Sequence, residues 1–281
     1  MIAAIESVTI AVGEMQSSVD LLEERLGLVV VGDARVSVGH LSAWHHPVHE
    51  SVRLIELASD RQALGRVRLA CVEDAGGERA TAAERGIVPG PSLLDFRAAS
   101  EPAKSLVMHG PAGLPLLCPS GPARPGPGHR LRSVWVVTAD PDLAGRFYTN
   151  VLGFVPARDD EAPSVADRHL VADALGVPHG TALQVAGYRL ANRTDAVVVV
   201  LHVPGLAEAQ PLHSIGLTRS GIRLLTCACE DLDALATRLR TFGVEPLTPP
   251  QHVGLPSGVP GQVMVTRGPS QELFEFIETV P

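Results

Sequence analysis

A glutamate lies inside an apolar, strand-like run near the end of the chain, in the segment ELFEFIE. Side chains of a strand alternate between its two faces, so Glu275 shares its face with Leu273 and Ile277. Burial among apolar side chains raises the pKa of a carboxyl group and lets it move a proton near neutral pH. Glu275 is therefore a candidate general acid or base. The alternatives are a glutamate at a strand edge and one paired with an arginine such as Arg223.

Histidines supply candidate partners for this carboxyl group. His202 ends the run AVVVVLHV and His213 lies in the loop that follows it, and either residue could complete an acid–base pair with Glu275. A surface or capping role is the alternative for each. Four more histidines cluster in residues 40–49, where they could bind a metal ion. Their irregular spacing around Pro47 favours a solvated loop instead.

A second candidate site lies in the strand-like segment RLRSVWVVT. By alternation, Ser133, Trp135 and Val137 share one face. Trp135 is either a stacking platform for an aromatic ligand or an ordinary core residue. No histidine stands near Ser133 in the sequence, so the segment does not by itself indicate a nucleophilic serine.

Composition and the absence of known catalytic motifs narrow the range of functions further. The 281 residues carry a net charge of −8, which disfavours nucleic acid or an anionic membrane as partner. The sequence contains no GxSxG, phosphate-loop, HExxH or strand-linked GxGxxG motif. The four cysteines show no CxxC spacing and are predicted to be plain buried thiols. No apolar run is long enough to span a membrane and no secretion signal is visible, so we expect a cytoplasmic protein.

An internal repeat organises these candidates. A shift of 126 residues aligns ESVTIAVGEMQSSVDLLEERLGLVVV with RSVWVVTADPDLAGRFYTNVLGFVPA and places Ser7 over Ser133. Each copy reads as a strand, a turn, a helix ended by glycine and a further strand. A third copy begins at GIRLLTCACEDLDALATRLRTFG and a weaker fourth at SLLDFRAASEPAKSLVMHG. With the strand-like runs after each helix, the pattern predicts a βαβββ element repeated up to four times.

These elements resemble the vicinal oxygen chelate superfamily, which includes glyoxalase I, extradiol dioxygenases and bleomycin-resistance proteins. The resemblance rests on DLAGRFYTNVLGF, EDLDALATRLRTFGVEP and GPSQELFEFIE. It implies an α+β fold of tandem βαβββ repeats that form two cupped, mostly antiparallel sheets with helices outside. It also implies a degenerate, shortened module over 1–118, a Pro/Gly-rich linker over 119–130 and a second module with the ligand cavity over 131–281.

The resemblance also suggests where this family would hold a divalent metal ion. Counting along the repeats places first-strand ligands at Ser7, Ser133 and Leu224, and last-strand ligands at Leu117 and Glu275. One carboxylate and weak hydroxyl oxygens do not form a tight site for a transition metal. We therefore predict no metal or other cofactor at this place, with a divalent metal held on displaced ligands as the alternative.

In this arrangement Ser133 and Trp135 are expected to face Glu275 across one cup. The residues predicted to contact a substrate are Ser133, Trp135, Val137, Leu224, Thr226 and Tyr188.

Three functions compete. The first is a metal-independent enzyme that uses Glu275, with His202 or His213, for isomerisation, cyclisation, elimination or ring-opening of an apolar or aromatic metabolite, in natural-product metabolism by resemblance alone. The second is a non-catalytic protein that sequesters a drug or metabolite. The third is a metal-dependent dioxygenase or lyase. Each takes a small molecule as partner, and the chain is expected to be a monomer or a homodimer.

Overall fold

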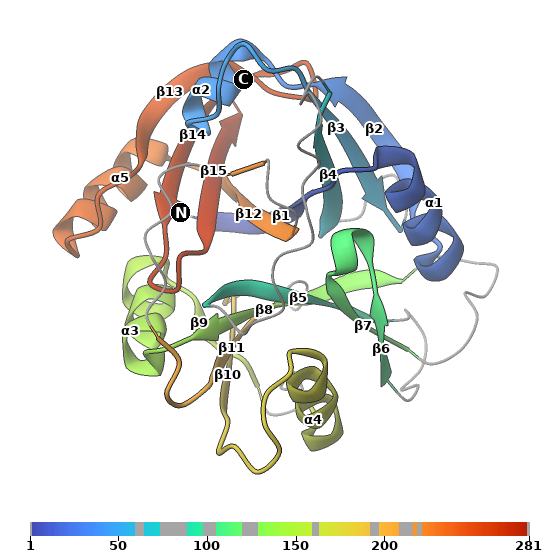
Figure 1. Cartoon of the computed structure of the whole chain (residues 1–281). Helices are drawn as coiled ribbons and strands as arrows, with labels where there is room; N and C mark the ends of the chain where they lie inside the picture. Colours follow the sequence, from blue (N-terminus) through green and yellow to red (C-terminus); the bar gives the residue numbers. More distant parts are fainter. Residues whose placement is uncertain are drawn as a thin grey trace.

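The computed structural model describes residues 2–59, 65–73, 89–97, 105–119, 129–158, 163–191, 197–207, 216–217 and 221–279. Two curled sheets dominate it, one in the upper and one in the lower half of Figure 1. The fold is the α+β architecture that the repeats predict.

The eight-stranded sheet has the order β13-β14-β15-β12-β1-β4-β3-β2. Its strands are β1 (Ile2–Ala11), β2 (Val29–Arg35), β3 (Val52–Ala58), β4 (Arg66–Val72), β12 (Gly221–Cys229), β13 (Thr248–Gly254), β14 (Pro260–Arg267) and β15 (Leu273–Thr279). The seven-stranded sheet has the order β6-β7-β5-β8-β11-β10-β9. Its strands are β5 (Gly90–Arg97), β6 (Ser105–His109), β7 (Pro115–Pro119), β8 (Arg130–Thr138), β9 (Val155–Pro156), β10 (Gln184–Arg189) and β11 (Val197–His202).

The pairing of the repeats differs from the prediction. We expected the two elements of each half to share a cup. Numbered in chain order, the four elements begin at β1, β5, β8 and β12, and the first element pairs with the fourth through β1 and β12. The second pairs with the third through β5 and β8. A repeat defines each unit by local pattern, whereas the choice of partner depends on contacts distant in the sequence. The division at 119–130 stays a prediction, since each sheet draws strands from both sides of that segment.

Three helices lie over the faces of the sheets that meet in the middle of the molecule. They are α1 (Met15–Leu26), α3 (Pro141–Arg146), which continues into the short turn η2 (Phe147–Val151), and α5 (Leu232–Thr241). Asp140 and Asp231 cap the second and third helices through their side chains. Gly27 ends α1 in the left-handed conformation, as the sequence predicts. A single-turn helix, η1 (Pro111–Gly113), joins β6 to β7.

Two further helices pack on the sheet faces that point away from the middle of the molecule. We call this curved face of the eight-stranded sheet the first cup and that of the seven-stranded sheet the second cup, and each cup holds one of the two helices. They are α2 (Val38–Ala43) in the eight-stranded sheet and α4 (Val165–Ala174) in the seven-stranded sheet, at opposite ends of the molecule in Figure 1. Leu41 and Trp44 join the apolar cluster of the first cup. Val171 joins that of the second cup, together with Trp135. Each cup is therefore filled in part by a helix, α2 in the first cup and α4 in the second.

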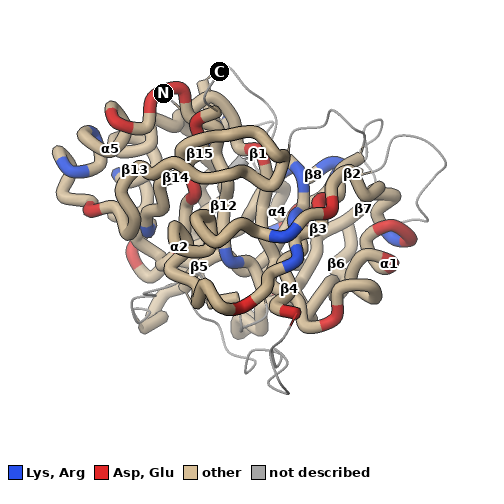
Figure 2. Tube along the Cα trace, turned by 90° about the horizontal axis from the view of Figure 1, so that it is seen from above, with Lys and Arg blue, Asp and Glu red and all other residues tan. Residues whose placement is uncertain are grey.

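Charged residues of both signs are interspersed over the described trace. Figure 2 shows arginines near β3 and β4 beside carboxylates. Arg53 pairs with Asp33 at 2.7 Å, and Arg35 pairs with Glu73 at 3.0 Å. Among the described residues, no helix is long and apolar enough to cross a membrane.

Candidate functional site

A row of polar side chains crosses the floor of the first cup. It comes from five neighbouring strands, in the order β15, β12, β1, β4 and β3. Its members are Glu275, Thr226, Ser7, Thr9, Arg68 and Glu56. Their sequence neighbours Phe274, Leu225, Val8, Leu69 and Ile55 belong to the central apolar cluster. Strand alternation thus places this row on the opposite face, inside the cup.

Glu275 is the centre of the row. Its side chain is fully buried, and Thr226 Oγ1 donates a hydrogen bond of 2.8 Å to its Oε2 atom. Arg68 Nη1 lies 3.4 Å from the same oxygen. The other oxygen, Oε1, accepts Trp44 Nε1–H at 2.6 Å and lies 2.5 Å from His40 Nε2. Four groups therefore occupy the carboxylate, which has about four acceptor sites.

Helix α2 carries two of these partners. Ser37 caps the helix by accepting the backbone N–H of His40, and its hydroxyl also donates to Gly254 O in β13 at 3.0 Å. Thr248 Oγ1 donates to Ala43 O at 2.6 Å and fixes the other end. Since residues four apart lie on one helix face, His40 and Trp44 point together at Glu275.

Glu275 is ionised. Burial raises the pKa of its carboxyl group, but His40, Arg68 and the hydrogen bond from Trp44 together outweigh that effect and hold the pKa at about 2. The raised pKa expected from an apolar surrounding is therefore wrong. The sequence suggested Arg223 as an example of an arginine that could pair with Glu275, and the structure shows Arg68 in this place.

His40 can act as a base at its second ring nitrogen. An ionised carboxylate only accepts hydrogen bonds, so Nε2 of His40 carries a proton toward Glu275 both in the imidazolium form, whose charge lowers the pKa of Glu275, and in the neutral form. In the neutral form Nδ1 is the unprotonated acceptor, and this atom makes no hydrogen bond with any described residue. The hydroxyls of Ser7 and Thr9 are buried nearby on the floor and likewise make none. Buried polar atoms of this kind are normally satisfied by protein, water or a ligand.

Arg68 links the two ends of the row. Its Nε lies 2.5 Å from Glu56 Oε1, and its Nη1 donates to Thr226 Oγ1 at 3.2 Å. Arg66 also contacts Glu56, at 3.2 Å. Two carboxylates and two guanidinium groups thus balance one another inside or beside the cup. Buried charges persist in a protein only when they are paired in this way.

Two predicted site residues lie in this cup. Thr226 contacts Glu275, while Leu224 belongs to the apolar cluster on the same face. The register places Thr226 opposite both Ser7 and Glu275, so Thr226 takes the position that counting assigned to Leu224. The count was wrong by two residues because Thr226 stands six residues before the start of α5, whereas Ser7 and Ser133 stand eight residues before the starts of α1 and α3.

Ser133 and Trp135 do not face Glu275. They lie in β8 of the seven-stranded sheet, which forms the other half of the molecule (Figure 1). This follows from the unexpected pairing of the repeats. Trp135 and Val137 are buried in the apolar cluster of the second cup, and Trp135 Nε1 has no hydrogen-bond partner among the described residues.

Ser133 instead contacts a carboxyl group that sequence reasoning missed. Its hydroxyl donates to Asp95 Oδ2 at 3.2 Å, and Arg97 Nε lies 3.3 Å from Asp95 Oδ1. Arg97 also donates to Asp167 of α4 at 2.8 Å. Burial raises the pKa of Asp95 to about 6, although Arg97 and Arg132 lower it in part. Leu117 lies opposite Asp95, as Glu275 lies opposite Thr226.

The remaining predicted residues lie away from Glu275. His202 ends β11 in the seven-stranded sheet, where its Nδ1 lies 3.2 Å from Thr138 O. Tyr188 in β10 stacks on Tyr148 in the central core, with ring centroids 5.2 Å apart. His213 lies outside the described residues.

The histidine cluster is not simply a solvated loop. His40 is fully buried, and His46 is buried with its Nε2 3.0 Å from Glu50. The exposed side chains are those of His45 and His49. The sequence did contain a signal for the helix that carries His40. His40 follows the capping Ser37 by three residues and precedes Trp44 by four, which is the spacing of a capped helix with both rings on one face.

The chain matches a known protein family. The family model of the Glyoxalase/Bleomycin resistance protein/Dioxygenase superfamily matches residues 130–276, which is just over half of the chain. The chain belongs to this superfamily. No curated protein sequence gives a significant match.

Solved structures of this superfamily have the same fold. Glyoxalase I from Zea mays is 13% identical and superposes with a TM-score of 0.63, covering 98% of this chain and 92% of that one. A point mutant of that enzyme gives 0.65 at 12% identity, covering 98% and 93%. A putative dioxygenase from Bacillus subtilis gives 0.61 at 12% identity, covering 100% and 86%. At such identities the likeness extends to the fold alone.

The first cup does not suit the divalent metal ion that the resemblance implies. The floor offers two carboxylates, Glu275 and Glu56, and Arg68 contacts both, with its guanidinium 3.4 Å from Glu275. A metal ion beside Glu275 would meet this positive charge and would have to displace Trp44 or Thr226 from the oxygens. Among the described residues, no group of three or more His, Cys, Asp or Glu side chains is placed to hold a metal ion.

Proposed function

We propose that the first cup is a metal-independent acid–base site for a small apolar or aromatic metabolite, with His40 as the base. The observation that carries this proposal is the geometry of His40, whose Nε2 is held by ionised Glu275 while Nδ1 has no described partner. A carboxylate that orients a histidine and stabilises its protonated form is a recurrent arrangement in general base catalysis. Glu275 then acts on His40, and His40 acts on the substrate.

The chemistry follows from the rest of the cup. The apolar lining formed by residues such as Leu224 and Ile277 favours an apolar substrate, and the free hydroxyls of Ser7 and Thr9 can donate to a substrate oxygen. His40 Nδ1 takes a proton from the carbon adjacent to the carbonyl group, the electron pair moves to the carbonyl oxygen as an enolate, and protonated His40 returns the proton to another atom of the substrate or to the leaving group. Isomerisation, cyclisation, elimination and ring-opening all use this step.

Natural-product metabolism remains the proposed setting on resemblance alone. The four free cysteines suit a reducing compartment, which supports a cytoplasmic location.

Non-catalytic binding of a drug or metabolite is the second candidate. It is favoured by the saturation of Glu275 and by the complete burial of His40 and Trp44 under the residues of the cup. In this second candidate the hydrogen bonds around Glu275 only stabilise the fold. A ligand would occupy the apolar surface of the cup without losing a proton.

Deuterium exchange separates the two candidates without knowledge of the natural substrate. Aromatic ketones with acidic C–H bonds, such as 2-tetralone and 1-indanone, are incubated with the protein in D₂O and followed by ¹H NMR. We expect exchange above the buffer rate, its loss in His40→Gln, and a reduction of at least about tenfold in Glu275→Gln. His179→Gln changes an exposed histidine on another loop and should exchange normally.

The outcomes are distinct. Exchange that persists in His40→Gln removes His40 from the mechanism. Ketones that bind the wild-type protein without any enhanced exchange support the non-catalytic candidate and overturn the acid–base proposal.

A further inference from the structure

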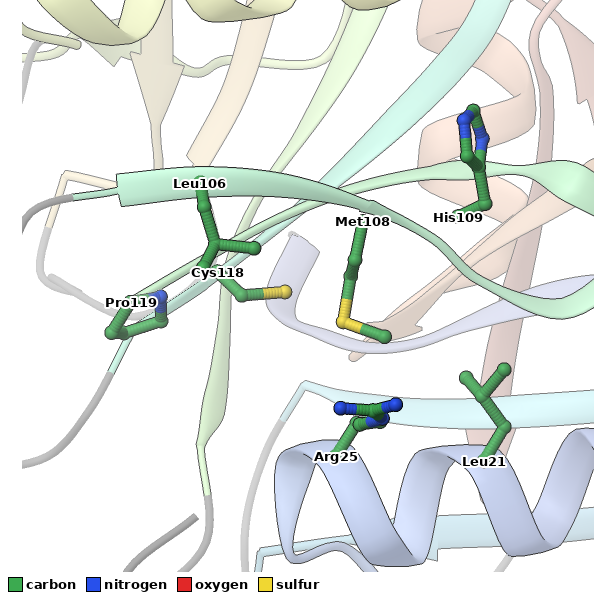
Figure 3. A pocket seen from close by; sticks show the side chains of 7 residues that line it. All are labelled: Leu21, Arg25, Leu106, Met108, His109, Cys118 and Pro119. Atoms are coloured by element: carbon green, nitrogen blue, oxygen red, sulfur yellow. The ribbon is translucent and has the colours of Figure 1, made fainter. Parts of the chain in front are cut away.

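A pocket lies outside both cups, between α1 and the β6–β7 hairpin. It has a volume of about 300 Å³, at the lower end of the range for small-molecule sites. Figure 3 shows Leu21 and Arg25 rising from α1 toward Met108, Leu106 and Cys118 on the two strands. None of these residues belongs to the polar row or to the Asp95 cluster.

Most of the surface of this pocket is apolar, and its charged or polar lining residues are Arg25 and His109. Leu21, Leu106, Met108 and Pro119 supply hydrocarbon and thioether surface. Burial raises the pKa of the Cys118 thiol to about 12, so this side chain stays protonated and uncharged at neutral pH. Leu106 is 38% exposed at the rim. An apolar group entering the pocket would cover this leucine and gain hydrophobic stabilisation.

Arg25 adds one positive charge to this apolar surface. No carboxylate is among the residues that line the pocket. The positions three and four residues away on α1 and beyond it are occupied by Leu21, Leu22, Leu28 and Val29, so the helix face offers the guanidinium no acidic neighbour. The chain has a net charge of −8, so Arg25 gives this pocket a positive charge in a protein that is negative overall.

The end of α1 does not need the Arg25 side chain as a cap. Gly27 N–H donates to Glu23 O at 3.0 Å, and Leu28 N–H donates to Leu22 O at 3.4 Å. The backbone N–H of His129 donates to Leu26 O at 2.8 Å. The carbonyl groups of Leu22, Glu23 and Leu26 therefore have donors other than the guanidinium, which remains available to an anion at the pocket.

We propose that this pocket binds a small monocarboxylate with an apolar tail. The tail occupies the surface between Leu21, Leu106 and Met108, and the carboxylate pairs with Arg25. Arginine suits this role because its planar guanidinium matches the two oxygens of a carboxylate. The volume suits a small molecule of this kind.

Methyl NMR tests this proposal directly. The sequence has four methionines, so protein labelled with ¹³C at the methionine methyl groups gives few signals, and Met108→Leu identifies the one in the pocket. Octanoate is the probe, with acetate lacking the tail and 1-octanol lacking the charge. We expect a saturable shift of the Met108 signal with octanoate, a weaker response to 1-octanol and none to acetate. The signal of Met264, which is fully buried in the central core, should stay constant.

Charge variants complete the design. Arg25 is exposed, so Arg25→Gln should fold normally, and we expect it to weaken octanoate about fivefold to tenfold while leaving 1-octanol unchanged. Arg240→Gln, which removes an exposed arginine from α5, is the matched control and should bind as the wild type does. The proposal is overturned if millimolar octanoate leaves the Met108 signal in place. Equal affinity in Arg25→Gln and Arg240→Gln would also overturn it.

Discussion

At the scale of single residues, burial and hydrogen bonding compete to set the charge of each carboxyl group, and they reach opposite results at two glutamates three positions apart. Four donors keep Glu275 ionised, with a pKa of about 2. Glu272 has two, Tyr148 Oη at 2.7 Å and the backbone N–H of Ser270 at 2.8 Å. For Glu272 burial dominates and raises the pKa to about 7. The number and charge of the donors, more than burial itself, decide which carboxyl group stays charged.

Glu272 should therefore make stability depend on pH. Its pKa is raised in the folded state, so it contributes stability below its ordinary value of 4.5, and that contribution is lost as pH rises to about 7. We expect the free energy of unfolding to fall by up to about 3 kcal/mol across this range. In Glu272→Gln the free energy of unfolding should depend less on pH over this range. Urea unfolding at closely spaced pH values measures this dependence. If the free energy of unfolding falls with pH as steeply in the variant as in the wild type, another group causes the effect.

Sequence reasoning identified some of these residues and missed others for physical reasons. Glu275 was found because one charge stands out in an alternating apolar strand. Asp95 and Arg68 carry the same signal in their own strands. His40 was missed because a six-residue helix shows too little periodicity to be distinguished from a loop. Strand alternation reveals which face a residue occupies, but not which residue lies opposite it.

At the scale of elements, α2 is a short helix whose position depends on β13. Its own backbone hydrogen bonds cannot stabilise a helix of six residues, so its side-chain ties and apolar face must do so. Ser37 and Thr248 hold its two ends to the same strand. Since β13 is the edge strand of the eight-stranded sheet, His40 is positioned by the margin of that sheet.

Thr248→Val should loosen this helix. The change leaves Ala43 O without its 2.6 Å hydrogen bond in a buried place, at a cost of about 1–2 kcal/mol. We expect faster amide hydrogen exchange at the end of α2 than in the wild type. Thr237→Val, which removes a comparable 2.9 Å hydrogen bond on the exposed face of α5, is the control and should change exchange in α2 little. Equal protection of α2 in both variants would mean that Thr248 does not hold it.

At the scale of the whole molecule, the two halves of the chain are joined through both sheets. The βαβββ units and the curled α+β fold could be predicted from the repeat, because each unit carries its own pattern of strands, helix and glycine stop. The partner of each unit could not, because it depends on which apolar faces fit together between units that are separate in the sequence, as far apart as β1 and β12.

Separated halves should consequently depend on each other. We expect the fragments 1–118 and 131–281, expressed singly, to show weak near-ultraviolet circular dichroism and early urea unfolding, because each would lack the partner strands of β1 or β8. Mixing them should restore a cooperative transition. Two fragments that each unfold cooperatively alone, at the midpoint of the intact chain, would show that the halves are independent domains after all.

The pairing of the first repeat with the fourth also sets an order for the growing chain on the ribosome. Strand β1 is synthesised first, yet its partner β12 begins only at residue 221. The strands of the seven-stranded sheet are all complete by residue 202, so that sheet can close while β1 still has an open edge. An exposed edge strand readily pairs with other chains, and domains fold as they emerge. Slow translation after β11 should therefore raise the aggregation of nascent chains, whereas slow translation after β15 should not.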